Sequence, residues 1–321
     1  MTHKRLGQEY LEPHEFQQTE TIVKAIKKRL LRDYKPGKVR RQFHAKMHAF
    51  VKASFTIEAE LPKHLQHGIF IPGKSYDAWI RFSNGSTRIQ EDGKADLRGM
   101  SIKIETGAGE IQDFLLVTYP TLMAPNVSEF SKVIQALCGG PWAMLAYAAN
   151  PFHWPVFYRT LSSLKKHSNL FSESFYSVSP YRLGPPEQAV KYAIQAGTGA
   201  PGLPKDKKNP NFLREVMQED LLTKTIAFDF MVQLQEDADA MPIENTCIKW
   251  TSPFIKVAGI QILPQQFCTK ERNALGENMS FAPWHCLKEH QPLGGVNRAR
   301  RAVYLAIAQF RLEQNKLLNY D

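Results

Sequence analysis

The sequence predicts an α+β protein built around an eight-stranded antiparallel β-barrel. Three observations lead to this prediction. Eight extended segments fall into two groups of four, a helical stretch over residues 127–170 separates the groups, and a long helical pattern lies near the end of the chain. Eight is the number of strands at which a closed barrel has an interior that side chains, or one small ligand, can fill.

The extended segments are separated by turn residues, which favours a meander of neighbouring strands. The stretch "SFTIEAEL" alternates apolar and polar residues, and the turns "IPGKS", "QEDGKAD" and "GAGE" come between it and the next three segments. In the first group we expect strands at 54–61, 76–83, 98–106 and 111–118. In the second group we expect strands at 174–183, 189–196, 225–234 and 254–263.

Apolar residues at helical spacing predict the helices. Ile22, Ile26 and Leu30 share one face of a helix expected over residues 14–34, which the turn "KPGK" ends. The stretch 127–170 has helical texture broken by "GGP" and by Pro151 and Pro155, and we expect its Trp, Phe and Leu residues to be mainly core. Further helices are expected at 209–222 and 294–319.

The composition is that of an ordinary globular protein, with 43% apolar and 22% charged residues. The net charge of +10 fits either attraction to an anion or simple solubility, and no zinc-finger spacing or aromatic and basic repeat points to nucleic acid. The four cysteines form no CxxC pair, so we expect free thiols in a reducing compartment. No secretory signal or membrane span is visible, and a cytoplasmic protein is expected.

An arginine and a tyrosine lie one helical turn apart in "NRARRAVY". Arg300 and Tyr304 share a helix face if residues 294–319 are helical. A guanidinium beside a phenol favours the phenolate, and binding a ferric ion is one reason for a phenolate to exist. The alternative is an ordinary amphipathic helix whose arginines face water.

A second group of residues precedes and follows the first expected strand. Arg41 and His44 have R-x-x-H spacing, and Arg81 and Ser83 lie on the next strand along the chain. Ser83 could orient the imidazole by a hydrogen bond, and the two arginines could bind carboxylates, since a buried arginine pair needs an anion. His48 is the alternative to His44.

In this order the motifs resemble those of haem catalases: "RxxH", "IRFS", "RGMSIKI", "DFLLVTYP" and "RxxxY". The segments "PFIKVAGIQILPQQF", "FAPWHCL" and "HQPLGGVNRAR" are more similar to the short catalase-related family, which keeps the haem-binding barrel and lacks the long arm and C-terminal domain of large catalases. The resemblance covers residues 39–312. It implies one haem-binding domain over 1–321, divided into an N-terminal helical arm (1–38), a barrel with a helical insert (39–265) and a wrapping segment with the proximal helix (266–321).

The resemblance also implies a cofactor and roles for individual residues. The cofactor is ferric haem b. Tyr304 matches the proximal tyrosinate ligand of the iron, as in catalases, and Arg300 matches the arginine that keeps it ionised. The remaining matches are His44 as the distal histidine, Ser83 as the serine that orients it, Arg41 and Arg81 as partners of the haem propionates, and Phe130 as a phenylalanine packed on the haem.

One position departs from the catalase pattern. Catalases have a distal asparagine three residues before the proline of the fourth-strand motif, where this chain has Val117, followed by Thr118. That asparagine positions peroxide, so its absence puts fast catalase turnover in doubt. Asn84 and Asn126 are the candidate substitutes.

The sequence therefore predicts a haem enzyme that consumes peroxide, with catalase or peroxidase activity and His44 as general base and then acid. The expected partners are a peroxide and an organic electron donor, with no nucleic acid and no membrane span, in a homodimer or monomer. Two alternatives stay open. One is a haem enzyme that rearranges fatty-acid hydroperoxides, for which the insert 127–170 would line an apolar channel, and the other is a non-enzymatic haem carrier.

Two further groups have ordinary explanations. His285 and Cys286 lack the partner spacing of a zinc site, so packing is the expected role. Asp237 and Asp239 are expected in a solvated loop.

Overall fold

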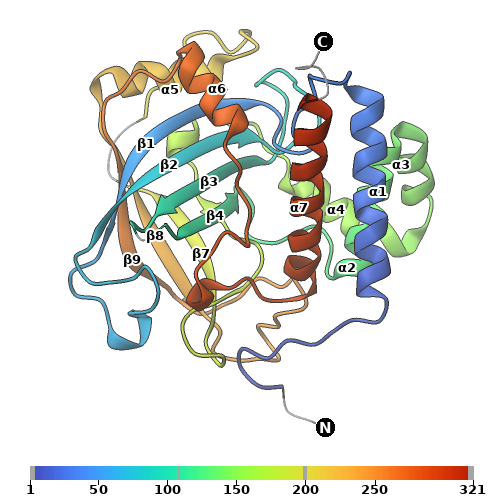
Figure 1. The fold of residues 1–321 in the computed structure, drawn as a ribbon, viewed down its shortest axis with the longest axis horizontal. Helices are drawn as coiled ribbons and strands as arrows, with labels where there is room; N and C mark the ends of the chain where they lie inside the picture. The colour runs from blue at the N-terminus through green and yellow to red at the C-terminus, as the bar shows by residue number, and fades with distance from the viewer. Residues whose placement is uncertain (1–3, 108, 198–200, 317–321) are drawn as a thin grey trace.

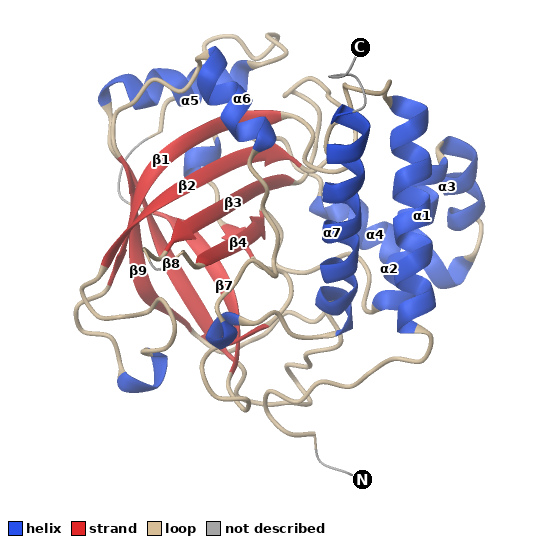
Figure 2. Cartoon of the chain, in the orientation of Figure 1, coloured by secondary structure: helices blue, strands red, loops and turns tan. Residues whose placement is uncertain are grey.

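A closed antiparallel barrel forms the centre of the computed structural model, which describes residues 4–107, 109–197 and 201–316. Eight strands form the ring in the order β1-β2-β3-β4-β5-β7-β8-β9, and β9 pairs with β1 to close it. Figure 2 shows the barrel with a group of helices on one side. The strands are β1 Met47–Ile57, β2 Ser75–Asn84, β3 Arg98–Glu105, β4 Ile111–Val117, β5 Phe175–Tyr176, β6 Tyr181–Arg182, β7 Ala189–Ala196, β8 Ile226–Leu234 and β9 Phe254–Ile262. The predicted fold class is confirmed.

Two strands differ from the prediction. The segment expected as one strand over 174–183 is divided into β5 and β6, because Val178 between them has a left-handed backbone with φ of 56°. The first strand begins at Met47 and not at residue 54, since the residues after Met47 are buried in a continuous run and show no alternation. This earlier start places His44 three residues before the strand.

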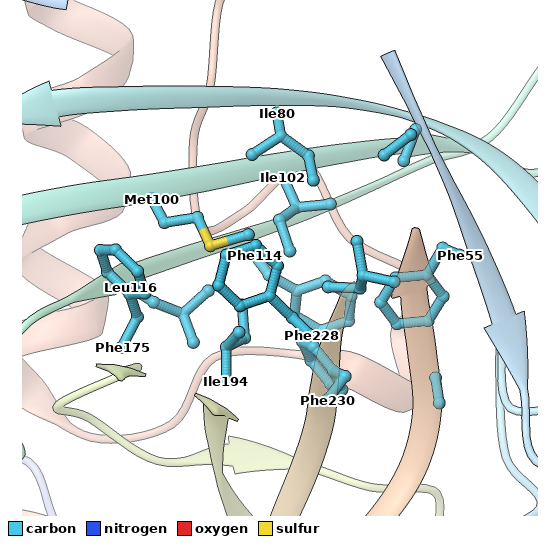
Figure 3. Packing of buried hydrophobic residues seen from close by; sticks show 14 of the residues in the cluster. Phe55, Ile80, Met100, Ile102, Phe114, Leu116, Phe175, Ile194, Phe228 and Phe230 are labelled. Carbon is cyan, nitrogen blue, oxygen red and sulfur yellow. The ribbon is translucent and has the colours of Figure 1, made fainter. Parts of the chain in front are cut away.

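Aromatic side chains fill the interior of the barrel. Phe114 lies 4.8 Å from Phe230 and Phe55 lies 5.0 Å from Phe230, measured between ring centroids (Figure 3). Aromatic and aliphatic side chains interdigitate here, so the interior of the barrel is packed core. A functional site therefore has to lie outside the barrel interior.

Seven α-helices lie outside the barrel in the described parts of the chain. α1 and α7 run side by side, and α2 packs against α1 through a shared apolar cluster that includes Ile26, Ile134 and Val303 (Figure 1). The helices are α1 Glu15–Asp33, α2 Val127–Gly139, α3 Pro141–Ala148, α4 Trp154–Ser163, α5 Phe212–Thr223, α6 Lys270–Asn278 and α7 Gly295–Lys316. The expected helices are present except that residues 317–319 lie outside the described residues, and α6 was not predicted.

The insert differs from its prediction in one respect. Its aromatic residues were expected to be mainly core, but Trp142, Phe152 and Trp154 are exposed. They belong to α3, to a 3-10 turn at Pro151–His153 and to α4. The composition of the segment could not distinguish an inward apolar face from an outward one.

Several single groups discussed for the sequence can be located in the structure. All four cysteines are free. The Asp237 carboxylate accepts hydrogen bonds from the backbone N–H groups of Asp239 and Ala240 in an exposed loop. His285 pairs with Asp113 at 3.0 Å, and no group of three His, Cys, Asp or Glu side chains in the described ranges can hold a metal ion. Within those ranges none of the helices has the length and apolar content to cross a bilayer.

Candidate functional site

His44 is held at the start of β1 by the ends of the neighbouring strands. Its backbone has φ of 58°, and its carbonyl oxygen accepts a hydrogen bond of 2.9 Å from Arg81 Nη2. Its imidazole Nδ1 lies 3.1 Å from Ser83 Oγ. Ser83 is buried and lies opposite Met47 in the ladder of β1 and β2. The structure thus brings together the predicted pair His44 and Ser83.

The surroundings of His44 favour a neutral ring. Burial, together with the positive charges of Arg81, Arg300 and Arg41, lowers the pKa of His44 from 6.5 to about 4. A neutral imidazole at physiological pH has a free lone pair. His44 can therefore accept a proton from a substrate.

Gly99 on β3 makes room for this imidazole, and sequence reasoning did not single it out. A Cβ atom added at Gly99 would lie 2.6 Å from His44 Nδ1 and 3.1 Å from Ser83 Oγ. Ser83, Gly99 and Val117 are successive partners across β2, β3 and β4. Val117, the position at which the sequence departs from the catalase pattern, is therefore the strand partner of Gly99, next to His44.

Replacing Gly99 by alanine is expected to displace the ring of His44 and to lower peroxide consumption about a hundredfold, since misplacement by about 1 Å has effects of this size. The matched control is Gly259→Ala in β9, where an added Cβ meets nothing within 4 Å. Initial rates of peroxide loss for the two variants provide the measurement. Equal rates in both variants would mean that the position of His44 is unimportant.

The alternative histidine, His48, belongs to a different group of buried residues. Its Nε2 contacts Asn84 Oδ1, its Nδ1 lies 3.7 Å from Asp92, and burial lowers its pKa well below the usual value. Asn84 Oδ1 also accepts a hydrogen bond from Arg98. His48 and Asn84 thus serve a buried polar network that joins the loop 85–97 to the barrel wall.

The second candidate for the missing asparagine is also engaged. Asn126 caps the N-terminus of α2, where its Oδ1 accepts a hydrogen bond of 3.0 Å from Glu129 N. The observed contacts of Asn84 and Asn126 are therefore structural ones. Neither amide contacts His44 in the described hydrogen bonds.

Arg41 and Arg81 near His44 interact electrostatically with a third arginine. Arg41 and Arg81 come from the chain before β1 and from β2, as predicted, and Arg311 from α7 joins them electrostatically. Burial and the mutual repulsion of the three cations lower the pKa of Arg41 to about 9, and burial lowers that of Arg81 to about 10 against the opposing effect of Glu277. Arg311 was missed, although it lies seven residues after Tyr304 and so on the same face of the helix.

A carboxylate from the unpredicted helix α6 lies among these arginines. Glu277 is 3.6 Å from Arg41 and 3.7 Å from Arg81. Arg41 also donates to the carbonyl oxygens of Gly276 and Met279 at the end of α6. Three cations and one carboxylate leave an excess of two positive charges, and the buried Nε atoms of Arg81 and Arg311 have no hydrogen-bond acceptor among the described residues.

Tyr304 and Arg300 lie together on α7, as predicted. The guanidinium carbon of Arg300 is 5.6 Å from the centre of the Tyr304 ring. Arg300 donates to Asn297 Oδ1 at 3.0 Å and to Ser179 Oγ at 3.3 Å, both of which are neutral groups. Burial lowers the pKa of Arg300, but the phenols of Tyr304 and Tyr181 outweigh this effect and the net shift is upward. Among the described residues, the groups that favour the charged form of Arg300 are thus the phenols of Tyr304 and Tyr181.

Phe130 completes the set of predicted residues. It is half-buried on α2 and packs against Val127, Val296 and Ala299, the last two from the first turns of α7. It therefore lies beside the part of α7 that carries Arg300. The packing of Phe130 on a haem stays a prediction.

The two groups of residues lie close enough to interact electrostatically. The positive charge of Arg300 acts on the pKa of His44, and Tyr304 acts on that of Arg41. The arrangement offers one phenol oxygen for a ferric ion, a neutral histidine, and an excess of two positive charges with two orphaned N–H groups for two carboxylates. These residues fit haem, which carries an iron and two propionates.

Known proteins resemble this chain in sequence and in fold. A catalase-related peroxidase of Mycolicibacterium paratuberculosis (strain ATCC BAA-968 / K-10) is 23% identical over an alignment of 253 residues, and the match covers 75% of this chain and 80% of that protein. No protein-family model matches the chain.

Solved structures of catalases have the same fold. A fungal catalase matches with a TM-score of 0.71 and 16% identity, covering 97% of this chain and 66% of the catalase. Catalase A from Saccharomyces cerevisiae matches with a TM-score of 0.70 and 17% identity, covering 97% and 68%. The chain thus spans about two thirds of the length of these catalases. The comparisons show the catalase fold and support the expected kinship with the catalase-related family.

Proposed function

We propose that this chain is a catalase-related haem protein that consumes peroxide, with His44 as the distal acid and base and Tyr304 as the proximal ligand. One observation carries the proposal. A neutral, serine-held histidine and an arginine-paired tyrosine lie near a cluster of buried arginines whose excess charge matches two carboxylates. The likeness in fold to catalases supports the same assignment.

Four residues of the chain would bind the haem and a fifth would stabilise the tyrosinate. Arg41, Arg81 and Arg311 hold the haem propionates, and Tyr304 supplies its oxygen to the iron. Bound ferric haem supplies the redox chemistry. Arg300 stabilises the tyrosinate because its other contacts are neutral.

His44 performs the proton transfer. Its neutral ring would accept the proton from one oxygen of the peroxide and deliver it to the other, which would leave as water, while bound ferric haem would supply the two electrons that cleavage of the O–O bond consumes. Ser83 holds Nδ1, which leaves Nε2 for this transfer. Gly99 allows the ring to take this position.

Val117 bears on the choice between catalase and peroxidase activity. In the row of residues beside His44 it presents an apolar group where catalases have an amide. An amide would hold a second hydrogen peroxide by hydrogen bonds, and a valine cannot. We therefore expect an organic electron donor to complete the reaction more readily than a second hydrogen peroxide.

The two alternatives make different demands on the structure. Rearrangement of fatty-acid hydroperoxides needs a long apolar channel, yet Trp142, Phe152 and Trp154 of the insert point to solvent. A non-enzymatic carrier needs Tyr304 and the arginines but has no use for the contact of His44 with Ser83. That contact therefore favours an enzyme. The cytoplasmic location, the monomeric or dimeric state and the division into one domain stay predictions.

The test of the proposal is a hemin titration of the purified protein followed by peroxide assays. We expect a Soret band with the features of a high-spin ferric haem bound through oxygen, and loss of hydrogen peroxide or cumene hydroperoxide in the presence of guaiacol. A protein that develops no Soret band with added hemin would refute the proposal. Product analysis with a fatty-acid hydroperoxide distinguishes reduction from rearrangement.

The arginine cluster gives a prediction that does not depend on turnover. Arg81→Gln is expected to weaken hemin binding at least about tenfold, because it removes a charged hydrogen-bond donor to a carboxylate. Binding of hemin dimethyl ester, which has no carboxylates, should change little. The measurement is a Soret titration with both compounds, and equal losses for both would show that Arg81 does not recognise carboxylates.

A further inference from the structure

The insert presents an unusual surface on the far side of the helices. Phe152 is 89% exposed, Trp142 82% and Tyr158 73%. Figure 1 shows α3 at the outer edge of the helical layer, away from the barrel. We call the exposed apolar residues of this region the insert surface: Trp142, Leu145, Phe152, Trp154, Phe157, Tyr158 and Leu161.

The spacing of these residues is that of an amphipathic helix turned outward. On α4 the exposed residues follow the pattern i, i+3, i+4, i+7, which places them on one face: Trp154, Phe157, Tyr158 and Leu161. On α3, Trp142 and Leu145 have the same relation, and Phe152 lies in the turn between the helices. Such a stripe normally faces the core, so its exposure indicates a partner.

The insert surface is held in shape by specific contacts. The ring of Tyr147 stacks on His153 with centroids 4.1 Å apart, and His153 Nδ1 lies 3.1 Å from Glu129. Trp154 Nε1 donates to the Ala148 carbonyl at 2.9 Å, which ties α4 to the end of α3. A fixed backbone keeps the aromatic rings outward.

The charged residues that follow Glu129 in the insert are all basic. Between Glu129 and Glu173 the sequence has no Asp or Glu, and its basic residues are Lys132, Arg159, Lys165 and Lys166. Lys132 pairs with Glu129, and Arg159 donates to the Met123 carbonyl. Lys165 and Lys166 are exposed directly after α4. The insert surface is therefore apolar and aromatic with a basic border.

We propose that the insert surface docks the protein on a lipid bilayer that carries anionic headgroups. Tryptophan and tyrosine favour the boundary between headgroups and acyl chains, and leucine and phenylalanine favour its apolar side. Lys165 and Lys166 reach the negative surface potential of such a membrane. This chemistry fits an anionic lipid surface better than a second copy of the chain, because a second copy carries the same net charge of +10.

The experiment is co-sedimentation of the full-length protein with vesicles of phosphatidylcholine alone or with phosphatidylglycerol. We expect binding to the anionic vesicles that decreases with added salt. Trp142→Ser/Phe152→Ser should weaken binding by about tenfold or more, since these rings supply much of the buried apolar area. Absence of binding to anionic vesicles would overturn the proposal.

Matched controls separate the insert surface from general charge and hydrophobicity. Phe16 is 72% exposed on α1, so Phe16→Ser should leave vesicle binding unchanged. Lys165→Glu/Lys166→Glu should weaken binding much more than Lys207→Glu/Lys208→Glu, which changes the net charge equally at other exposed lysines.

Sedimentation velocity without lipid tests whether a second copy of the chain, and not a bilayer, covers the insert surface. We expect wild type and the Trp142→Ser/Phe152→Ser variant to sediment alike. A wild-type dimer that the substitutions convert to a monomer would assign the insert surface to self-association and overturn the proposal. Equal vesicle binding by the insert variants and the Phe16→Ser control would overturn it as well.

Discussion

Replacing Tyr304 by phenylalanine is expected to lower peroxide consumption by at least about a thousandfold, which corresponds to about 4 kcal/mol of transition-state stabilisation. The substitution removes one oxygen atom and leaves the ring beside Arg300, whose guanidinium carbon is 5.6 Å from the ring centre. Arg300 then retains only neutral contacts to Asn297 and Ser179. The proposed iron ligand and a phenol oxygen beside the buried Arg300 would both be lost.

The absorption spectrum of the hemin-titrated variant provides the first measurement. We expect the bands of an oxygen-ligated ferric haem in the wild type and their displacement in Tyr304→Phe, with a weaker affinity for hemin. Tyr10→Phe, at a partly exposed tyrosine in the N-terminal segment, is the matched control and should behave as the wild type. An unchanged spectrum in Tyr304→Phe would show that another residue binds the iron.

The barrel could be predicted because its information is local. Alternation, turn residues and helical spacing identified the strands and most helices. The first strand was misplaced because Ala49, Phe50 and Val51 are all buried, so the run gives no alternating pattern. The division of the strand at 174–183 depends on the backbone of Val178, which no composition rule anticipates.

The candidate site was predicted only where family motifs exist. His44, Ser83, Arg41 and Arg81 stand in two short motifs, and the structure brings them together. Glu277 was missed because its contact with the arginines depends on how α6 folds over β1. Gly99 matters because the ring of His44, which precedes β1, approaches it across the sheet. No pattern within β3 indicates this approach.

The outward insert illustrates a different limit. An apolar stripe at helical spacing indicates that one face of the helix is apolar, but it does not indicate what covers that face. The sequence favoured core, and the structure turns Trp154, Tyr158 and Leu161 to solvent. Only the position of α4 relative to α2 and α3 could decide between the two.

Replacing His44 by alanine is expected to lower peroxide consumption by about a hundredfold to ten-thousandfold, the usual range for loss of a general acid and base. Hemin affinity should change little, because Tyr304 and the arginines are retained. This separation distinguishes an enzyme from a haem carrier. A variant that consumes peroxide at the wild-type rate would exclude His44 as the distal base.

The dependence of the wild-type rate on pH provides a second test of the same residue. Transfer requires the neutral ring, and the burial of His44 beside three arginines lowers its pKa from 6.5 to about 4. Since a lowered pKa keeps the base form present above that value, the rate should stay constant from neutral pH down to about pH 5 and fall as the pH passes through 4.

The profile must be measured with the protein still folded, so circular dichroism at each pH accompanies the rate. A decline in the rate centred near pH 6.5 would mean that the histidine that transfers the proton is exposed to water and does not feel the charges of the arginines. In the His44→Ala variant the residual rate should no longer fall as the pH passes through 4. Persistence of this fall in the variant would assign it to another group and would contradict the role given to His44.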